Sequence, residues 1–429
     1  MKKYESYKET NIQWLGKIPS HWNTIKFKRL FSFGRGLSIT KADLVDEGVP
    51  VISYGQIHSK QNTGTNIENH LLRYIPDTYI EGNDSSKVSK GDFIFADTSE
   101  DLEGCGNCVY IDKDYQLYAG YHSIIARNIK FTDAKYLAYL FKTDCWRSQI
   151  RSSVNGVKVF SITQNTLSDT DVLIPSFTEQ QAIASYLDYK VGQIDSVIAE
   201  KEKMLDDLKV YRSSVISEAV TKGLDKNVPM KDSGIEWLGM IPYYWSLIKM
   251  KFISNLQSGS NLTSEEIMDS GLYPVYGGNG IRGYFNEYNT EGSFVLIGRQ
   301  GALCGNINYA DGKFWATEHA VVCHPRTEYD VVWFGSLLEI MNLNQYSISS
   351  AQPGLSVERI ENLLIPIPPI EEQKRIGEYI GVKGKTIELA INELLSQIED
   401  LKSYKSSVIT EAVTGKVDLQ EWNKQIVTA

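Results

Sequence analysis

The stretch that decides the fold is Leu208–Thr221, LKVYRSSVISEAVT, because it returns later in the chain as Leu401–Thr414, LKSYKSSVITEAVT. Eleven of the 14 positions are identical at a constant offset of 193 residues. Self-similarity of this length does not arise by chance, so the chain contains an internal repeat.

A second motif repeats at a different offset. It pairs Trp-Leu-Gly with Ile-Pro and a second Trp, and its two copies lie 223 residues apart. The segment between the two motifs is therefore 30 residues shorter in the second copy. The intervening segments, 24–173 and 247–366, show little similarity to each other. Constant flanks around dissimilar middles indicate interchangeable modules on a fixed scaffold; duplication followed by drift is the alternative, but it does not explain why only the flanks stayed alike. The copies are Trp14-Leu15-Gly16, Ile18-Pro19 and Trp22, then Trp237-Leu238-Gly239, Ile241-Pro242 and Trp245.

Apolar residues at alternating steps of three and four predict a long helix from Ile194 to Thr221, which would be about 42 Å long. The second copy carries the same stripe in the same phase, so the two helices can pack as an antiparallel coiled coil. Two amphipathic helices that each lie on their own domain are the alternative. The predicted seam residues are Ile194, Ile198, Leu205, Leu208, Val215, Ile387, Ile391, Leu394, Ile398, Leu401 and Val408.

The helix starts also leave a signature. Thr178 and Gln181 have the spacing of a capping box just after Pro175, which predicts the start of the first helix. Glycine is a poor helix former, so Gly192 in the first copy, and Gly381 and Gly384 in the second, predict a break between a short leading helix and the long one.

The two variable segments share an order of short strands followed by a helix, which predicts α+β domains. In the first segment the expected strands are 49–57, 91–96 and 108–111, with a helix over 133–150. In the second, they are 273–280, 293–301 and 320–323, with a helix over 331–341. The full expectation is two α+β domains held apart by the two long helices in a pseudo-two-fold repeat.

Loops in both variable segments place Gly beside Arg, Asn, Gln and Tyr. Glycine lets a backbone approach a phosphate closely, and Arg, Asn and Gln have the geometry that reads guanine or adenine edges. Ordinary turns between strands are the alternative for any single residue. The candidate nucleic-acid contacts, which include basic residues flanking the loops, are Lys26, Lys28, Arg35, Tyr54, Gln56, Lys249, Lys251, Tyr276, Asn279, Arg282, Arg299 and Gln300.

No catalytic or metal site is expected. The GxGxxG match over 278–283 is not followed by a helix start, and the chain has no GxxxxGK[ST] phosphate loop. Cys105 and Cys108 have metal-ligand spacing, but no second CxxC exists. The six histidines show no grouping with acids in the sequence that would imply catalysis.

These motifs resemble the specificity (S) subunit of type I restriction-modification systems. The resemblance rests on the Trp-Leu-Gly-x-Ile-Pro-x-x-Trp motif, on the helix starts marked by Glu179-Gln180 and Glu372-Gln373, and on the repeated helix end. It implies a non-catalytic chain whose two variable segments are target-recognition domains, each reading one half of a split double-stranded DNA sequence. It further implies that the helices set the separation of the half-sites and dock two methyltransferase (M) subunits.

The resemblance also implies where the chemistry resides. Adenine methylation with S-adenosylmethionine would belong to the M subunits, and ATP- and Mg-dependent cleavage to restriction (R) subunits, so that this chain holds no cofactor itself. The expected domains are 1–173 with the first recognition domain, 174–223 as a central helical region, 224–366 with the second recognition domain, and 367–429 as a C-terminal helical region.

Composition bounds the partners. The chain of 429 residues has a net charge of −9 and no apolar run long enough to span a membrane, so we expect a cytoplasmic protein. Residues 23–174 carry a net charge of −1 and residues 246–366 a net charge of −5. No recognition segment is basic, so we expect the isolated chain to bind DNA weakly and its complex to bind tightly. A stand-alone scaffold that binds protein or carbohydrate through its two variable domains remains the alternative.

Overall fold

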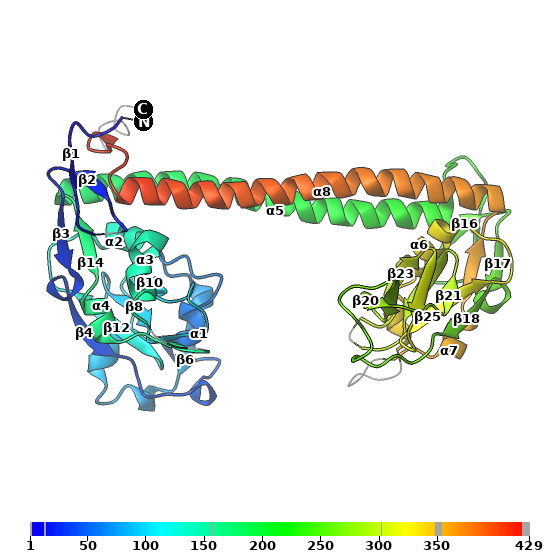
Figure 1. The fold of residues 1–429 in the computed structure, drawn as a ribbon, viewed down its shortest axis with the longest axis horizontal. Helices are drawn as coiled ribbons and strands as arrows, with labels where there is room; N and C mark the ends of the chain where they lie inside the picture. The colour runs from blue at the N-terminus through cyan, green and yellow to red at the C-terminus, as the bar shows by residue number, and fades with distance from the viewer. Residues whose placement is uncertain are drawn as a thin grey trace. The chain divides into compact units, whose positions relative to one another are not determined.

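The computed structural model describes residues 2–12, 14–154, 156, 158–301, 303–347 and 354–422 (Figure 1). The chain divides into two compact units. Unit 1 holds the residues up to Glu200 together with those from Gln397 onward, and unit 2 holds Lys201–Ser396. Two long helices, α5 (Phe177–Lys222) and α8 (Ile370–Val413), each contribute one part to each unit.

Two four-stranded sheets form the middle of unit 1. The first is antiparallel in the order β10-β8-β12-β4, and the second has the order β6-β5-β11-β7 with β5 and β11 parallel. All four residues of β8, Phe-Ile-Phe-Ala, are buried, which is why this strand reads as a continuous apolar run. The strands are β4 (Phe31–Arg35), β5 (Val49–Ile52), β6 (Arg73–Ile75), β7 (Lys87–Val88), β8 (Phe93–Ala96), β10 (Cys108–Tyr110), β11 (Leu117–Ala119) and β12 (Ser123–Asn128).

Unit 2 has the same sheet topology, although its sequence is different. Its first sheet has the order β23-β22-β25-β18, and its second has the order β20-β19-β24-β21 with β19 and β24 parallel. The two variable segments are therefore versions of one α+β domain. The strands are β18 (Ser254–Ser258), β19 (Tyr273–Gly277), β20 (Gly280–Phe285), β21 (Thr290–Glu291), β22 (Phe294–Gly298), β23 (Ile307–Ala310), β24 (Lys313–Ala316) and β25 (Ala320–Pro325).

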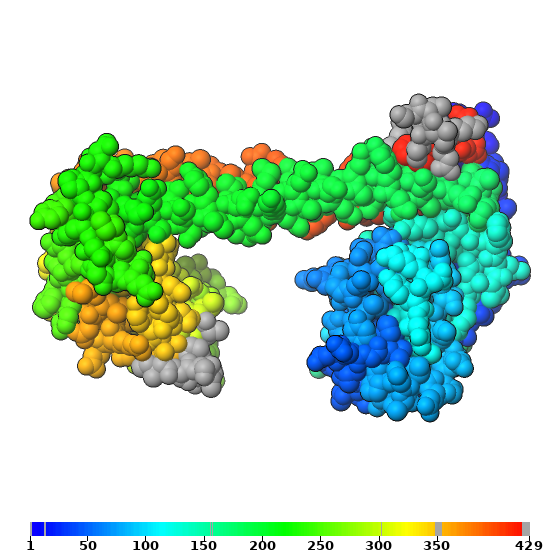
Figure 2. All heavy atoms as spheres, turned by 180° about the vertical axis from the view of Figure 1, so that it is seen from behind, coloured from blue at the N-terminus to red at the C-terminus, as the bar shows by residue number. Residues whose placement is uncertain are grey.

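Short two-stranded pairs complete each unit. In unit 1, β1 (Tyr7–Glu9) pairs with β2 (Lys17–Pro19), β3 (Asn23–Lys26) with β14 (Asp171–Ile174), and β9 (Thr98–Ser99) with β13 (Phe160–Ser161). In unit 2, β15 (Met230–Asp232) pairs with β16 (Met240–Pro242), and β17 (Ser246–Lys249) with β26 (Leu364–Ile367). The C-terminal segment also returns to unit 1, where the Asp418 amide donates to the Lys2 carbonyl at 2.9 Å, and Figure 2 shows the red segment against the blue one.

The short helices differ in part from the sequence prediction. The helix expected over 133–150 is two helices, because the side chain of Thr143 ends the first and caps the second. The residues after β5 form a helical turn and not the continued strand that we predicted over 49–57. The helix predicted over 331–341 is present with nearly the same bounds. These helices are α1 (Tyr54–Ile57), α2 (Ala134–Lys142), α3 (Asp144–Arg151), α4 (Gln164–Ser168), α6 (Val331–Ile340) and α7 (Val357–Glu361).

We predicted that Thr178 caps the start of α5, but the capping residue is Ser176. The Ser176 amide donates to Glu179 Oε2 at 3.3 Å, and the Glu179 amide donates back to Ser176 Oγ at 3.4 Å, so the capping box lies two residues earlier. The glycines at 192, 381 and 384 do not break the helices: both α5 and α8 run through them without interruption. Each glycine costs about 1 kcal/mol of helix stability relative to alanine, which the packing of the flanking turns outweighs.

The long helices pack against each other within each unit. In unit 1, Ile183 early in α5 shares a core with Val413 late in α8, whereas Ile198 further along α5 clusters with Ile398, so the helices are antiparallel. The Lys405 ammonium pairs with Asp195 at 2.6 Å beside this cluster. Of the predicted seam residues, the buried ones are Ile194, Ile198, Ile387, Leu394, Ile398 and Val408, and the half-buried ones are Leu205, Leu208, Val215, Ile391 and Leu401.

A Glu-Gln pair at the start of each long helix ties the repeated motif to the recognition domain. In unit 1, the buried Glu179 accepts a hydrogen bond from the indole of Trp22 at 3.0 Å, and Gln180 accepts one from the Asp133 amide at 2.8 Å. Asp133 in turn caps α2. Unit 2 repeats this arrangement with the pairs Trp245–Glu372 and Asp330–Gln373. The repeated residues are therefore a scaffold that fixes one domain to one helix end.

Candidate nucleic-acid interface

Loops from both sheets of unit 1 line a hollow of about 710 Å³. They are the turn after β4, the connection after β8, the turn between β11 and β12, and the segment before α4. The predicted contact Arg35 lies here, together with Asp97 and His122. The hollow is thus built from loops at one end of the sheets, where side chains can vary without disturbing the core.

Loops of unit 2 line an open hollow of about 620 Å³, and two of them, the segment after β22 and the turn between β24 and β25, are equivalent to loops of the unit 1 hollow. Three predicted contacts converge in it, although they come from different loops: Asn279 and Arg282 belong to the β19–β20 hairpin, and Gln300 follows β22. The Asn306 side-chain amide donates to Asn279 Oδ1 and so fixes the orientation of that side chain. Amide and guanidinium groups in one hollow are the donor and acceptor set that reads base edges.

Two glycines at equivalent positions of the two units are required by the protein's own packing. A Cβ added at Gly36 would lie 1.8 Å from the carbonyl oxygen of Gly120. At the equivalent Gly259, the Cβ would lie 2.0 Å from the carbonyl oxygen of Ala316. The turns after β4 and after β18 therefore cross directly over the second sheet of their own unit.

The other loop candidates have partners within their own units. Gln56 accepts a hydrogen bond from the Ser53 amide at 3.2 Å, so its carbonyl caps α1. The ring of Tyr276 lies 5.4 Å from Phe314, and burial raises the pKa of its hydroxyl, which places Tyr276 at the edge of a core. The guanidinium of Arg299 lies 3.4 Å from Ser258 Oγ.

Tyr54 lines a separate hollow in unit 1, of about 580 Å³. Its ring lies 4.6 Å from the ring of His58. Burial and the nearby Glu100 raise the pKa of the Tyr54 hydroxyl, so this group stays a neutral hydrogen-bond donor at physiological pH.

The flanking lysines line neither loop hollow. Lys26 pairs with Asp171 at 3.0 Å across the β3–β14 strand pair, and Lys28 pairs with Asp169 at 3.4 Å. In unit 2, Lys251 donates to the side chain of Asn362 at 3.0 Å, and Lys249 ends β17. Lys26 and Lys249 thus end strands of the pairs that close each domain, and Lys28 and Lys251 lie in the short helical turns that follow those strands.

Two histidines that the sequence analysis did not group with acids lie in the hollows. His122 Nδ1 lies 3.1 Å from Asp97 Oδ1 in unit 1, and His319 Nε2 lies 3.1 Å from Glu318 Oε1 in unit 2. The signal was present as Ala-x-x-His at residues 119–122 and 316–319. It repeats at an offset of 197, which matches neither of the two repeats that organise the chain.

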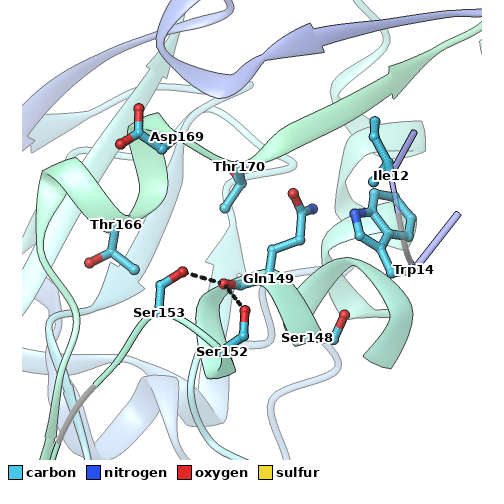
Figure 3. A pocket seen from close by; sticks show the side chains of 9 residues that line it. All are labelled: Ile12, Trp14, Ser148, Gln149, Ser152, Ser153, Thr166, Asp169 and Thr170. Atoms are coloured by element: carbon cyan, nitrogen blue, oxygen red, sulfur yellow. Dashed lines mark hydrogen bonds between the residues drawn. The ribbon is translucent and has the colours of Figure 1, made fainter. Parts of the chain in front are cut away.

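A further hollow of about 570 Å³ lies beside the first repeated motif and is drawn in Figure 3. The hydroxyls of Ser152 and Ser153 donate to the carbonyl oxygen of Gln149, as the dashed lines show. The Gln149 side chain in turn binds the backbone of Asp171 in β14. The polar groups of this hollow hold the domain together, so we place the interface at the loop hollows.

The cysteines of the CxxC segment are buried and free. Burial raises the pKa of the Cys108 thiol to about 12, and it also raises the pKa of Cys105. Thiols with raised pKa values are poor metal ligands and poor nucleophiles, because both roles need the thiolate. Within the described part of the chain, no three His, Cys, Asp or Glu residues are grouped as metal ligands, and no helix has the length and apolar character needed to cross a membrane.

Comparison with known proteins places this architecture in a family. The pattern of the type I restriction modification DNA specificity domain matches residues 19–203 and 242–400. The type I restriction enzyme EcoprrI specificity subunit of Escherichia coli is 40% identical over 163 residues, which cover 37% of this chain and 40% of that protein. The EcoKI specificity subunit of Escherichia coli (strain K12) is 23% identical over 446 residues, which cover 94% of this chain and 91% of that protein.

Solved structures show the same fold. A chain from a type I R-M system, solved to explain complex assembly and conformational transition, superposes with a TM-score of 0.71 at 16% identity, covering 93% of this chain and 99% of that chain. The HsdS subunit from Thermoanaerobacter tengcongensis gives a TM-score of 0.51 at 16% identity, covering 93% and 98%. Since the family pattern matches once in each half and covers most of the residues, the chain belongs to the type I restriction modification DNA specificity family, the specificity (S) subunits of type I restriction-modification systems.

Proposed function

We propose that this chain is the DNA-recognition subunit of a type I restriction-modification complex, and that each unit reads one half of a bipartite duplex target. The observation that carries the proposal is the repeated topology of the two units with unlike residues at equivalent positions of the loops. Arg35, Asp97 and Tyr121 in unit 1 stand where Ser258, Arg299 and Glu318 stand in unit 2. A constant frame with variable contact residues suits two modules that read different base sequences.

The domain division follows from this reading. Residues 1–173 and 224–366 would each comprise a repeated motif with a recognition domain, and residues 174–223 and 367–429 would be the helical regions. The Trp–Glu and Asp–Gln contacts support the division, because they attach each recognition domain to one helix start. The helices would then transmit the spacing between the half-sites.

We also propose that α5 and α8 dock two M subunits. Apolar side chains remain exposed along both helices at intervals of seven residues, which is the spacing of one helix face over two turns. On α5, Val197 is 40% exposed and Met204 is 53% exposed; on α8, Val382 and Leu389 are both 62% exposed. Exposed apolar side chains in such a row favour contact with partner helices.

The chemistry would belong to the partners. S-adenosylmethionine would bind the M subunits, and ATP and Mg would bind the R subunits, while this chain supplies the sequence specificity. With net charges of −1 and −5 in the two variable segments, the chain would depend on its partners for much of the phosphate affinity.

The helix spacer gives a direct test of this function. Seven residues would be inserted into α5 after Leu205 and seven into α8 after Ile391, so that both seams keep their phase. The pair would lengthen by about 10 Å. Modified-base mapping in cells that contain the M subunits is expected to show the same bases at a different separation, or to show no modification at all. An unchanged separation, or a change in the bases themselves, contradicts the proposal.

A further inference from the structure

The same backbone hydrogen bonds place a histidine in the hollow of each unit. The carbonyl oxygen of His122 accepts from the Asp97 amide at 3.3 Å, and that of His319 accepts from the Arg299 amide at 2.9 Å. Two residues earlier in the chain, each turn is anchored to the parallel strand: the Gly120 amide donates to the Ile52 carbonyl at 2.7 Å in unit 1, and the Thr317 amide to the Tyr276 carbonyl at 2.9 Å in unit 2. The two histidines are therefore at equivalent positions.

The residues around the two histidines are otherwise different. Between the alanine that ends the strand and the histidine stand Gly120 and Tyr121 in unit 1, but Thr317 and Glu318 in unit 2. Both units thus have a histidine at the same position of this turn, although the two residues before it differ. A histidine at this position in both units is explained if it contacts a feature that both half-sites share, such as the DNA backbone. A contact with one specific base would not explain it, because the two half-sites differ in sequence.

Each histidine is held by a carboxylate, and the two carboxylates come from different positions. Asp97, which follows β8, lies 3.1 Å from a ring nitrogen of His122. The position equivalent to Asp97 in unit 2 is Arg299, and there Glu318 supplies the carboxylate at 3.1 Å from His319. Both units therefore contain a histidine–carboxylate contact, although the two carboxylates come from non-equivalent positions of the fold.

Packing and backbone conformation do not explain the histidines. The side chain of His122 is 60% exposed and that of His319 is 36% exposed, so neither fills a core. His122 has a positive φ of 52°, a conformation that non-glycine residues rarely adopt and that favours His, Asn and Asp. Among the residues with described backbone, His319 is not one of those with a positive φ, so the conformation is no reason for a histidine in both units.

The geometry points to His122 and His319 as matched phosphate-binding residues, one in each recognition domain. In the free chain, the carboxylate of Asp97 or Glu318 occupies the position that a DNA phosphate oxygen takes in the complex. The backbone phosphate is the feature that two different half-sites share, and it carries no sequence information. A ring N–H that donates to a carboxylate oxygen can donate equally to a phosphate oxygen. This inference rests on the proposed function of the chain in DNA recognition.

The exchange is energetically accessible. Polar contacts between side chains as exposed as these contribute little to folding stability, so they are readily broken when DNA arrives. Arg35 lines the hollow of unit 1 and Arg282 that of unit 2, so each hollow holds a cation that attracts the DNA duplex. Each acidic side chain would then act as a competitor that lowers the affinity for every duplex alike.

The test uses the chain assembled with its M subunits and measures binding to a target duplex and to a scrambled duplex over a range of salt concentrations. His122→Asn retains a residue that tolerates the positive φ but removes the imidazole ring that faces Asp97, and His319→Asn is its counterpart in unit 2. Each variant is expected to weaken binding to both duplexes by about fivefold, with the same loss on the target and on the scrambled sequence. His70→Asn is the matched control, since His70 is exposed in unit 1 but lines neither hollow, and it should bind like the unaltered chain.

The acidic partners give a change of opposite sign. Asp97→Asn and Glu318→Gln are each expected to raise the affinity for both duplexes by about two- to threefold, and Asp97→Asn should have no effect in a His122→Asn background. Asp114→Asn and Asp269→Asn, at exposed positions outside the hollows, measure the general effect of removing a negative charge.

Three outcomes would overturn the inference. One is a loss of affinity on removing the carboxylates, which would make them supports of the histidines and not competitors. Another is a change in the methylated sequence of the histidine variants, which would make them base-reading residues. The third is unaltered binding by correctly folded histidine variants. A complex of the unaltered chain that fails to prefer any bipartite target would instead refute the proposed function.

Discussion

Trp22 and Glu179 are joined by a hydrogen bond of 3.0 Å from the indole Nε1 to a buried carboxylate oxygen, although 157 residues separate them in the chain. Trp245 and Glu372 make the same bond at 3.1 Å in unit 2. The second tryptophan of each repeated motif therefore meets the first turn of the long helix that follows its recognition domain. This contact explains why both sequence motifs recur while the segments between them differ.

The ionisation of Glu179 should stabilise the protein at neutral pH, and this contribution should be lost in acid. Burial opposes ionisation, but the hydrogen bonds that the carboxylate accepts outweigh this effect and lower its pKa from 4.5 to about 2. A carboxyl whose pKa is depressed on folding stabilises the protein above the unfolded-state pKa, and this contribution is lost as the pH falls toward the folded-state pKa. The unfolding temperature of unit 1 is therefore expected to fall between about pH 4.5 and pH 2. The donors are His21, Trp22, Ser176 and Gln420.

Glu179→Ala tests this contact directly. The substitution leaves the buried indole N–H of Trp22 without its acceptor, so we expect a loss of about 2 to 3 kcal/mol in the free energy of unfolding at pH 7. The variant should also lose stability less steeply than the unaltered chain between pH 4.5 and pH 2. Glu200→Ala, at an exposed site of the same helix, should differ from the unaltered chain by no more than about 0.5 kcal/mol. An acid profile of Glu179→Ala that parallels the unaltered one would contradict the role assigned to this carboxylate.

The apolar seam in unit 1 should respond to cavity formation. Ile198→Ala and Ile398→Ala, measured by chemical denaturation, are each expected to cost about 2 to 4 kcal/mol, since both side chains are buried in one cluster. The double variant should lose less than the sum, because the two deletions share a cavity. Val197→Ala is the control, as Val197 is 40% exposed on the same helix. Strict additivity of the two isoleucine deletions would mean that these side chains do not contact each other.

Much of the scaffold was predictable, because helices and repeats leave periodic patterns in a sequence. The steps of three and four in α5 and α8 were sufficient to predict both helices, but they did not show that packing would carry them through Gly192 and Gly381. The strands of each domain were visible as apolar runs, whereas their shared order depends on pairings between distant segments. Those pairings became apparent only from the structure.

The candidate interface was predictable only in part. Asn279, Arg282 and Gln300 come together because they lie in glycine-rich turns at one end of the sheets. Tyr276, from a similar turn, packs against Phe314 instead, and residue type alone does not distinguish these outcomes. His122 was missed because its partner Asp97 is 25 residues away in the sequence.

Arg282 offers a test of base reading by unit 2. Arg282→Ala, in complex with the M subunits, is expected to weaken binding to the target duplex by about 1 to 3 kcal/mol and to relax the sequence preference at one position of one half-site. Arg326→Ala is the control. Arg326 follows the end of β25 that lies away from His319, so this substitution removes an equal charge outside the hollow. Modified-base mapping compares the two variants. An equal loss on scrambled DNA with no relaxed position would make Arg282 a phosphate contact.

The charge distribution predicts how affinity is shared in the complex. The isolated chain should bind a target duplex weakly and with a small salt dependence, and addition of the M subunits should raise both the affinity and the salt dependence. Fluorescence anisotropy with and without the M subunits over a range of salt concentrations measures this. Tight binding by the isolated chain would show that basic groups within the recognition domains are sufficient.

The most direct test of the central claim is a segment exchange followed by modified-base mapping. Residues 24–173 would be replaced by the equivalent segment of another family member, while both repeated motifs and both long helices stay unchanged. We predict that one half of the methylated sequence changes to that of the donor, and that the other half and the separation between halves stay the same. A change in both halves, or in neither half when the exchanged protein is folded and assembled, would contradict the assignment of one half-site to each unit.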